Sequence, residues 1–233
     1  MNFALASSEG FGFLLRWLHY FFGIVWIGHL YYFNFTQGPF FAETDAATKS
    51  AATQKLVPRA LWWFRWGAMF TFVTGLIYLL IKSATLGAAM ATSSWGVCIL
   101  IGAALGTIMW GNVWFVIWPA QKIVIQNAVD TAQGKPANPV AAGRAARALV
   151  ASRTNTLFSM PMLFFMSAAS HLPIQINESS QLCILSITLA AVIGLLELNA
   201  LKGKTGPMTT VKGVIHCSLA LTVVVYAMVE IFC

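Results

Sequence analysis

The amino-acid sequence predicts an all-α fold, a polytopic membrane bundle of about six transmembrane helices that forms one membrane domain over residues 1–233. Three observations predict this class: the composition, the length of the apolar segments and the placement of the basic residues. Hydrophobic residues make up 58% of the chain and charged residues only 9%. A soluble domain carries roughly 25% charged residues. Because so few charges cannot solvate a globular surface, we expect membrane lipids to be the main solvent.

Six apolar segments approach or exceed the roughly 20 residues that a helix needs to cross a bilayer. They lie near 11–33, 62–81, 95–118, 155–171, 182–201 and 213–232. The fourth segment is the shortest, and it contains Pro161, which predicts a kink in its helix.

Basic residues gather in alternate connections between these spans. The connections between spans one and two, three and four, and five and six contain twelve of them: Lys49, Lys55, Arg59, Arg65, Lys122, Lys135, Arg144, Arg147, Arg153, Lys202, Lys204 and Lys212. The opposite side has only Arg16 and Lys82. Because positively charged loops stay in the cytoplasm, this asymmetry predicts that both termini lie outside. The dispersed charge also argues against nucleic-acid binding, which uses one basic patch.

Ionisable side chains inside a span are costly in lipid and therefore indicate function. At the expected outer end of the bundle these residues are Arg16, His19 and His171. Arg16 lies one helical turn from His19, on nearly the same face. Two interpretations stay open. His19 and His171 would ligate haem iron while Arg16 pairs with a propionate, or His19 hydrogen-bonds across the bundle while Arg16 reaches the headgroups.

A second group of polar residues lies nearer the expected cytoplasmic end: His29, Arg65, Asn112, Glu197 and His216. His29 and His216 lie at similar depths on the first and last spans, which would suit the two ligands of a second or alternative haem. We expect Arg65 and Glu197 to form a buried ion pair between the second and fifth spans. His19 and His29 are ten positions apart, so their side chains point roughly 80° apart around the helix. This spacing favours one haem over two.

Four segments, taken in order, resemble a known family: LRWLHYFFGIVWIGHLYYFNF, ALWWFRWGAMFTFVTGLIYLL, MWGNVWFVIWPAQK and SRTNTLFSMPMLFFMSAASHLP. Over roughly residues 10–175 they are similar to the membrane part of the urate oxidase N-terminal family, which includes the membrane-bound urate hydroxylases. The resemblance implies a multi-pass protein of the bacterial inner (cytoplasmic) membrane, linked to redox chemistry. It matches His19 to the family's first-helix histidine and His171 to the histidine that ends the SRxNT segment, which favours both as haem ligands.

The sequence departs from the family pattern in two places. The best-known members carry a c-type cytochrome domain marked by CxxCH, and this sequence contains no such motif. Thr154 stands where a Ser-Arg-His-Asn pattern would place a histidine. The resemblance therefore implies a short form of the family without the c-type cytochrome domain.

Three functions remain as hypotheses. The first is a haem-b membrane redox protein or subunit of a respiratory or oxidase assembly, whose partner would be a cytochrome, a quinone or a larger respiratory complex. The second is a membrane enzyme that oxidises urate or a related purine, for which the sequence identifies no catalytic residue. The third is a cofactor-free accessory subunit that packs on a larger complex through small residues such as Gly102, Gly106 and Gly111.

Overall fold

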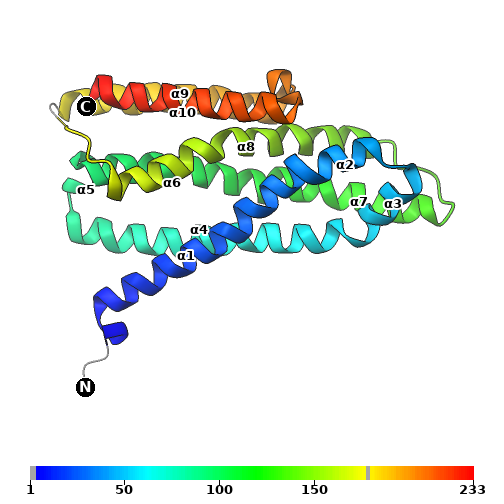
Figure 1. Ribbon diagram of the computed structural model, residues 1–233, viewed down its shortest axis with the longest axis horizontal. Coiled ribbons are helices and arrows are strands. Elements are labelled where there is room, and N and C mark those ends of the chain that lie inside the picture. Colours follow the sequence, from blue (N-terminus) through cyan, green and yellow to red (C-terminus); the bar gives the residue numbers. More distant parts are fainter. Residues whose placement is uncertain (1–3, 177–178) are drawn as a thin grey trace.

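The computed structural model of the chain describes residues 4–176 and 179–233, and the chain is helical along most of these ranges (Figure 1). The longer helices are α1 (Ser8–Tyr31), α4 (Val57–Leu86), α6 (Ser94–Gly111), α7 (Trp118–Ala132), α8 (Ala141–His171), α9 (Ser179–Lys202) and α10 (Val211–Phe232). The shorter elements are the 3₁₀-helices η1 (Ala4–Ala6) and η4 (Gly206–Thr209), the helices α2 (Gly38–Glu43), α3 (Ala46–Lys55) and α5 (Ala89–Thr92), and the π-helices η2 (Tyr32–Gln37) and η3 (Asn112–Ile117). The predicted all-α class is confirmed.

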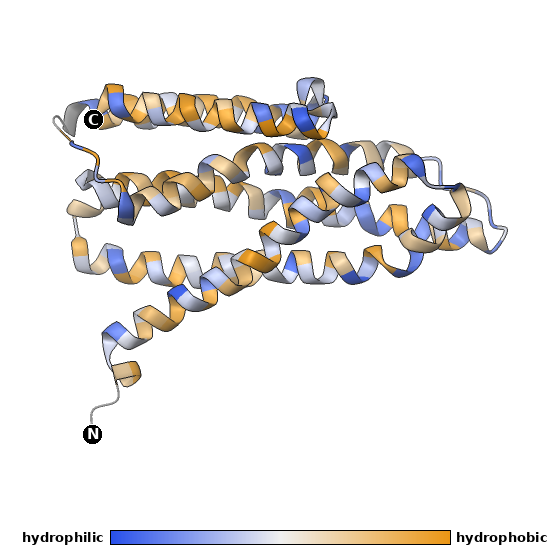
Figure 2. Cartoon of the chain, in the orientation of Figure 1, coloured by the Kyte–Doolittle hydropathy of each residue, from blue (hydrophilic) through white to orange (hydrophobic). Residues whose placement is uncertain are grey.

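Five continuous helical segments of the described chain are long and apolar enough to cross a membrane: Ser8–Glu43, Val57–Leu86, Ser94–Ala132, Gln181–Lys202 and Val211–Phe232. Figure 2 shows that hydrophobic residues dominate these helices. The chain is therefore a multi-pass membrane protein. The remaining expected span, 155–171, lies in α8, whose buried polar residues make it less apolar than the other five.

Apart from α1, which runs obliquely across the bundle, the long helices are arranged in layers along a common axis (Figure 1). Helices α9 and α10 pack together on one side of the bundle, and α1 crosses α4 on the other. Between them lies α8, which packs on α6, α7 and α10 and is the central element. The start of α1 and the end of α10 lie at the same end of the bundle.

Two of the expected interhelical loops are largely helical, and near the start of each a π-helix ends two residues before a proline, Pro39 or Pro119. A proline inside an α-helix lacks an N–H group and clashes with the preceding turn. A π turn is wider, because its hydrogen bonds reach back five residues. The N–H of Gly38 donates to the Phe33 carbonyl in this way. The wider turns allow α1 and α6 to continue past both prolines.

Pro161 lies inside α8 and leaves one carbonyl of α8 free to accept a hydrogen bond from α10. A proline cannot donate to the carbonyl four residues earlier, which here belongs to Leu157. The hydroxyl of Ser218 in α10 donates to that carbonyl across 2.7 Å, and the Ser218 side chain is fully buried. Neighbouring helices commonly satisfy carbonyls that a proline has freed in this way. The kink expected at Pro161 stays a prediction.

Candidate functional site

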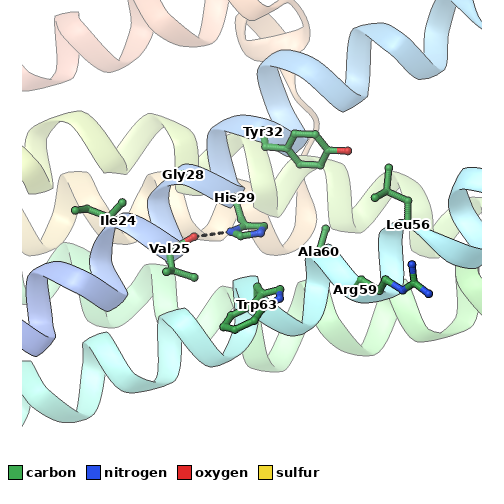
Figure 3. Close-up of a pocket in the computed structure, with 9 residues that line it drawn as sticks. All are labelled: Ile24, Val25, Gly28, His29, Tyr32, Leu56, Arg59, Ala60 and Trp63. Carbon is green, nitrogen blue, oxygen red and sulfur yellow. Dashed lines mark hydrogen bonds between the residues drawn. The ribbon is translucent and has the colours of Figure 1, made fainter.

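A cavity of about 520 Å³ lies between α1 and the first turns of α4. It is lined by Ile24, Val25, Gly28, His29, Tyr32, Leu56, Arg59, Ala60 and Trp63 (Figure 3). Most of this lining is apolar, and its polar side chains are those of His29, Tyr32, Arg59 and Trp63. Ile24 is 75% exposed and Trp63 53% exposed, so the cavity opens on the lipid-facing surface of the bundle.

His29 is held in one orientation by a hydrogen bond within its own helix. Its Nδ1 atom lies 2.7 Å from the Val25 carbonyl oxygen. A carbonyl only accepts hydrogen bonds, so Nδ1 carries the hydrogen and donates it. The other ring nitrogen, Nε2, then has a free lone pair, and Figure 3 shows the ring directed into the cavity above Trp63 and Ala60. Histidines that bind metals are oriented by the same kind of second hydrogen bond.

The residues around this cavity fit a haem. The Nε2 atom of His29 supplies an imidazole ligand for the iron, and the apolar walls suit a macrocycle. Arg59 extends toward the Leu56 end of the cavity (Figure 3), where its guanidinium could pair with a propionate. Arg59 was predicted only as a basic residue of the first connection. Its position one turn before Trp63 was the signal that these two side chains share a face.

His19 has a different environment. Its Nδ1 atom lies 2.9 Å from the Thr71 carbonyl of α4, so the ring bridges the two helices. A Cβ atom added to Gly75 would lie 2.8 Å from His19 Cε1, which shows that the ring fills the space that this glycine leaves. Arg16 is exposed and lies 5.6 Å from the centroid of the Tyr78 ring. This geometry is that of a histidine hydrogen-bonded across the bundle.

The structure does not bring the predicted histidine pairs together. His171 is exposed at the end of α8, and His216 is exposed on α10. Helix α10 packs on α8 and α9, whereas α1, which carries His19 and His29, packs mainly on α4. Among the described residues, no group of three or more His, Cys, Asp or Glu side chains could hold a metal ion. Of the four histidines, all of which lie in the described ranges, it is His29 that lines the α1–α4 cavity.

The expected ion pair between Arg65 and Glu197 is wrong. In the part of the chain that the structure describes, the only ion pair joins Lys135 and Asp130. The Glu197 carboxylate accepts a hydrogen bond of 2.9 Å from the amide of Asn112. The Arg65 guanidinium stacks on a tryptophan, with Cζ 3.9 Å from the centroid of the Trp118 ring. The partner of the Glu197 carboxylate is thus the neutral amide of Asn112 and not the Arg65 guanidinium.

The SRTNT segment of α8 supplies polar partners to both π-helices. The amide of Asn34 in η2 donates to the Ser152 hydroxyl across 2.8 Å. The amide of Asn112 in η3 donates to Asn155, and Asn155 in turn donates to the Met109 carbonyl. Thr154, at the position of the missing histidine, is fully buried and donates to the carbonyl of its own preceding turn. These side chains satisfy polar groups that would otherwise be unpaired in the bundle.

A second, smaller cavity of about 160 Å³ lies beside this segment. Its polar lining consists of Asn34, Gln37, Gln121 and Ser152, and the remaining lining is apolar. The Oε1 atom of Gln37 is buried and has no hydrogen-bond partner among the described residues. The cavity therefore presents an acceptor that a donor from a bound molecule could satisfy. Gln37 and Gln121 were not predicted as site residues, because single amides at span ends form no motif.

Comparison with known proteins identifies one family. The family model described as urate oxidase N-terminal matches residues 76–229. The match confirms the resemblance, but it covers a different range from the expected 10–175. It includes α9 and α10, and it begins within α4, so that α1 with His19 and His29 lies outside it. Neither the curated proteins nor the solved structures contain a match to this chain.

Proposed function

Because the chain belongs to the urate oxidase N-terminal family, we propose that it is a membrane redox protein that holds a b-type haem through His29. One observation carries the proposal. The imidazole of His29 is fixed by the Val25 carbonyl and presents a free Nε2 atom to a cavity of about 520 Å³. The family's description names an oxidase, which is consistent with redox chemistry. The proposal moves the expected haem site from His19 and His171 to the α1–α4 cavity.

Four side chains of the cavity have a defined task in this proposal. His29 would bind the iron, and its Nδ1–H bond to the Val25 carbonyl holds the ring in one orientation. Arg59 neutralises an acidic side group, while Ile24 and Trp63 exclude water from the macrocycle. The bound haem would supply one-electron oxidation and reduction of its iron. Since the cavity opens on the lipid-facing surface, the electron partner is a membrane quinone, a cytochrome or a larger respiratory complex.

The test is the haem content of the purified protein. Protein from haem-replete cells should give a b-type pyridine haemochrome and a reduced-minus-oxidised absorption band. We expect His29→Ala to lose the haem and His19→Ala to keep it, because both variants remove an imidazole from α1 but only one faces the cavity. A colourless wild-type preparation contradicts the proposal, and its co-purification with a respiratory complex would select the accessory subunit. Loss of haem only in His19→Ala would indicate that the haem is bound at His19, at the expected outer end of the bundle.

A second candidate function is the oxidation of urate or a related purine, which the smaller cavity favours. Purines have several N–H and carbonyl groups on one flat ring system. The cavity offers the amides of Gln37 and Gln121, whereas the Asn34 amide already donates to the Leu30 carbonyl and the Ser152 hydroxyl. Membranes that contain the protein should then consume urate, and Gln37→Leu should slow consumption without loss of haem. The absence of urate consumption in a haem-replete preparation would exclude this activity.

A further inference from the structure

Two cations from different helices lie against one tryptophan. The Arg65 guanidinium of α4 lies 3.9 Å from the centroid of the Trp118 ring in α7, and the Lys122 ammonium lies 5.7 Å from the same centroid. Arg65 also lies 6.0 Å from the ring of Trp114 in η3. Arginine and lysine are attracted to the face of an indole ring. The result is a cluster of two positive charges and two indoles at the junction of α4, η3 and α7.

Two donors of this cluster are buried without an acceptor. The Nε atom of Arg65 and the Nε1 atom of Trp114 are both buried, and neither has a hydrogen-bond partner among the described residues. No described carboxylate pairs with Arg65 or Lys122, since the one ion pair in the described ranges is that of Lys135 and Asp130. A buried donor without an acceptor is costly. The cluster therefore calls for an acceptor from outside the chain, and that acceptor should be an anion.

The depth of the cluster indicates which anion this is. Trp62 and Trp63 precede Arg65, and together with Trp114 and Trp118 they form an aromatic belt of the kind found at the membrane–water interface. Phospholipid phosphates lie at that interface. A guanidinium binds a phosphate through two parallel hydrogen bonds, and basic residues near the bilayer surface are attracted to anionic lipids. The headgroup phosphates of the lipids thus lie at the same depth as the cluster.

We propose that Arg65, Lys122 and the Trp114 indole form a binding site for the headgroup phosphate of an anionic phospholipid. The phosphate accepts hydrogen bonds from the Arg65 guanidinium and the Trp114 indole, while Lys122 adds a second positive charge. Trp118 holds both cations in place through its ring face. The acyl chains lie along the apolar surface between α4 and α7. The bound lipid joins these two helices, which share few other contacts.

The experiment measures lipid retention in nanodiscs and by native mass spectrometry. Wild-type protein in phosphatidylcholine should retain added phosphatidylglycerol selectively. Arg65→Gln and Lys122→Gln should each weaken this retention about fivefold, as expected for one cation near an anionic surface. Lys49→Gln is the matched control. The Lys49 ammonium also lies over an aromatic ring, 6.0 Å from the Phe41 centroid. Among the described residues, no buried, unpaired donor lies on α2 or α3, the helices that carry Phe41 and Lys49.

Three results would overturn the proposal. One is equal retention of phosphatidylglycerol in wild-type protein and Arg65→Gln. Another is an equal loss in Lys49→Gln, which would show a non-specific surface effect. The third is displacement of the lipid by millimolar inorganic phosphate, which would show that the site takes a free anion. Should both glutamine variants fail to fold, a thermal melt of the wild type decides: its Tm should rise with phosphatidylglycerol, and an unchanged Tm overturns the proposal.

Discussion

The side-chain amide of Asn112 donates to the Glu197 carboxylate across 2.9 Å, joining η3 to α9 inside the bundle. The same amide donates to Asn155 Oδ1 across 3.0 Å. Both hydrogens of the Asn112 amide are therefore used, and Asn112 links α8 and α9 to the π-helix. An asparagine suits this position because it satisfies two acceptors without adding charge.

This arrangement predicts which residue is energetically coupled to Glu197. In double-mutant cycles followed by thermal unfolding in detergent, Asn112→Ala and Glu197→Ala should show a coupling of about 1 kcal/mol or more, because their bond involves a carboxylate. Arg65→Gln and Glu197→Ala should be additive within about 0.5 kcal/mol, as expected for residues without shared partners. Strong coupling of Arg65 to Glu197 would mean that the ion pair forms after all.

The sequence predicted the helical membrane class and the polar residues inside spans, but it could not predict which side chains meet. The spans are apolar on most faces, so their periodicity does not show which side of a helix is buried. For this reason His29 was paired with His216, although α1 rests on α4. The π-helices before Pro39 and Pro119 were missed for a related reason. Whether a helix ends at a proline or widens before it depends on partners such as Ser152 and Asn155, which are distant in sequence.

The bond from Ser218 to the Leu157 carbonyl should stabilise the contact between α8 and α10. Ser218→Ala leaves that carbonyl unpaired, because Pro161 has no N–H to donate. We expect a loss of about 1 kcal/mol, within the range measured for hydrogen bonds between membrane helices. Thermal unfolding in detergent measures it. Ser186→Ala is the control, since the Ser186 hydroxyl is exposed and bonds only within its own helix.

A second substitution separates this explanation from a packing effect. Pro161→Ala restores an N–H that can donate to Leu157, so Ser218→Ala should cost less in that background than in the wild type. Equal costs in both backgrounds would show that Ser218 acts through packing and not through the freed carbonyl.

His19 should hold α1 against α4 only while Gly75 leaves room for its ring. Gly75→Ala would place a methyl group 2.8 Å from His19 Cε1 and displace the ring from the Thr71 carbonyl. We expect a loss of about 1–2 kcal/mol in the free energy of unfolding, typical of an overpacked site. Gly23→Ala is the control, because its methyl would meet its nearest neighbour, on Thr71, at an ordinary 4.0 Å. In a His19→Ala background the Gly75→Ala loss should disappear, and a loss that persists would place the clash elsewhere.

Gly28 allows the α1–α4 cavity to be filled without disturbing the helices. A Cβ atom at Gly28 meets nothing within 4 Å, and Gly28 lines the same cavity as His29. Gly28→Phe should therefore occupy the haem space and lower the haem content of the purified protein. Its helical stability should not fall, because glycine is the residue least suited to a helix interior after proline. Gly194→Phe is the matched control, since Gly194 also has nothing within 4 Å but lies on α9, away from the cavity. Haem content measured by pyridine haemochrome should fall in Gly28→Phe alone, and full haem occupancy in that variant would show that the ligand binds outside the His29 cavity.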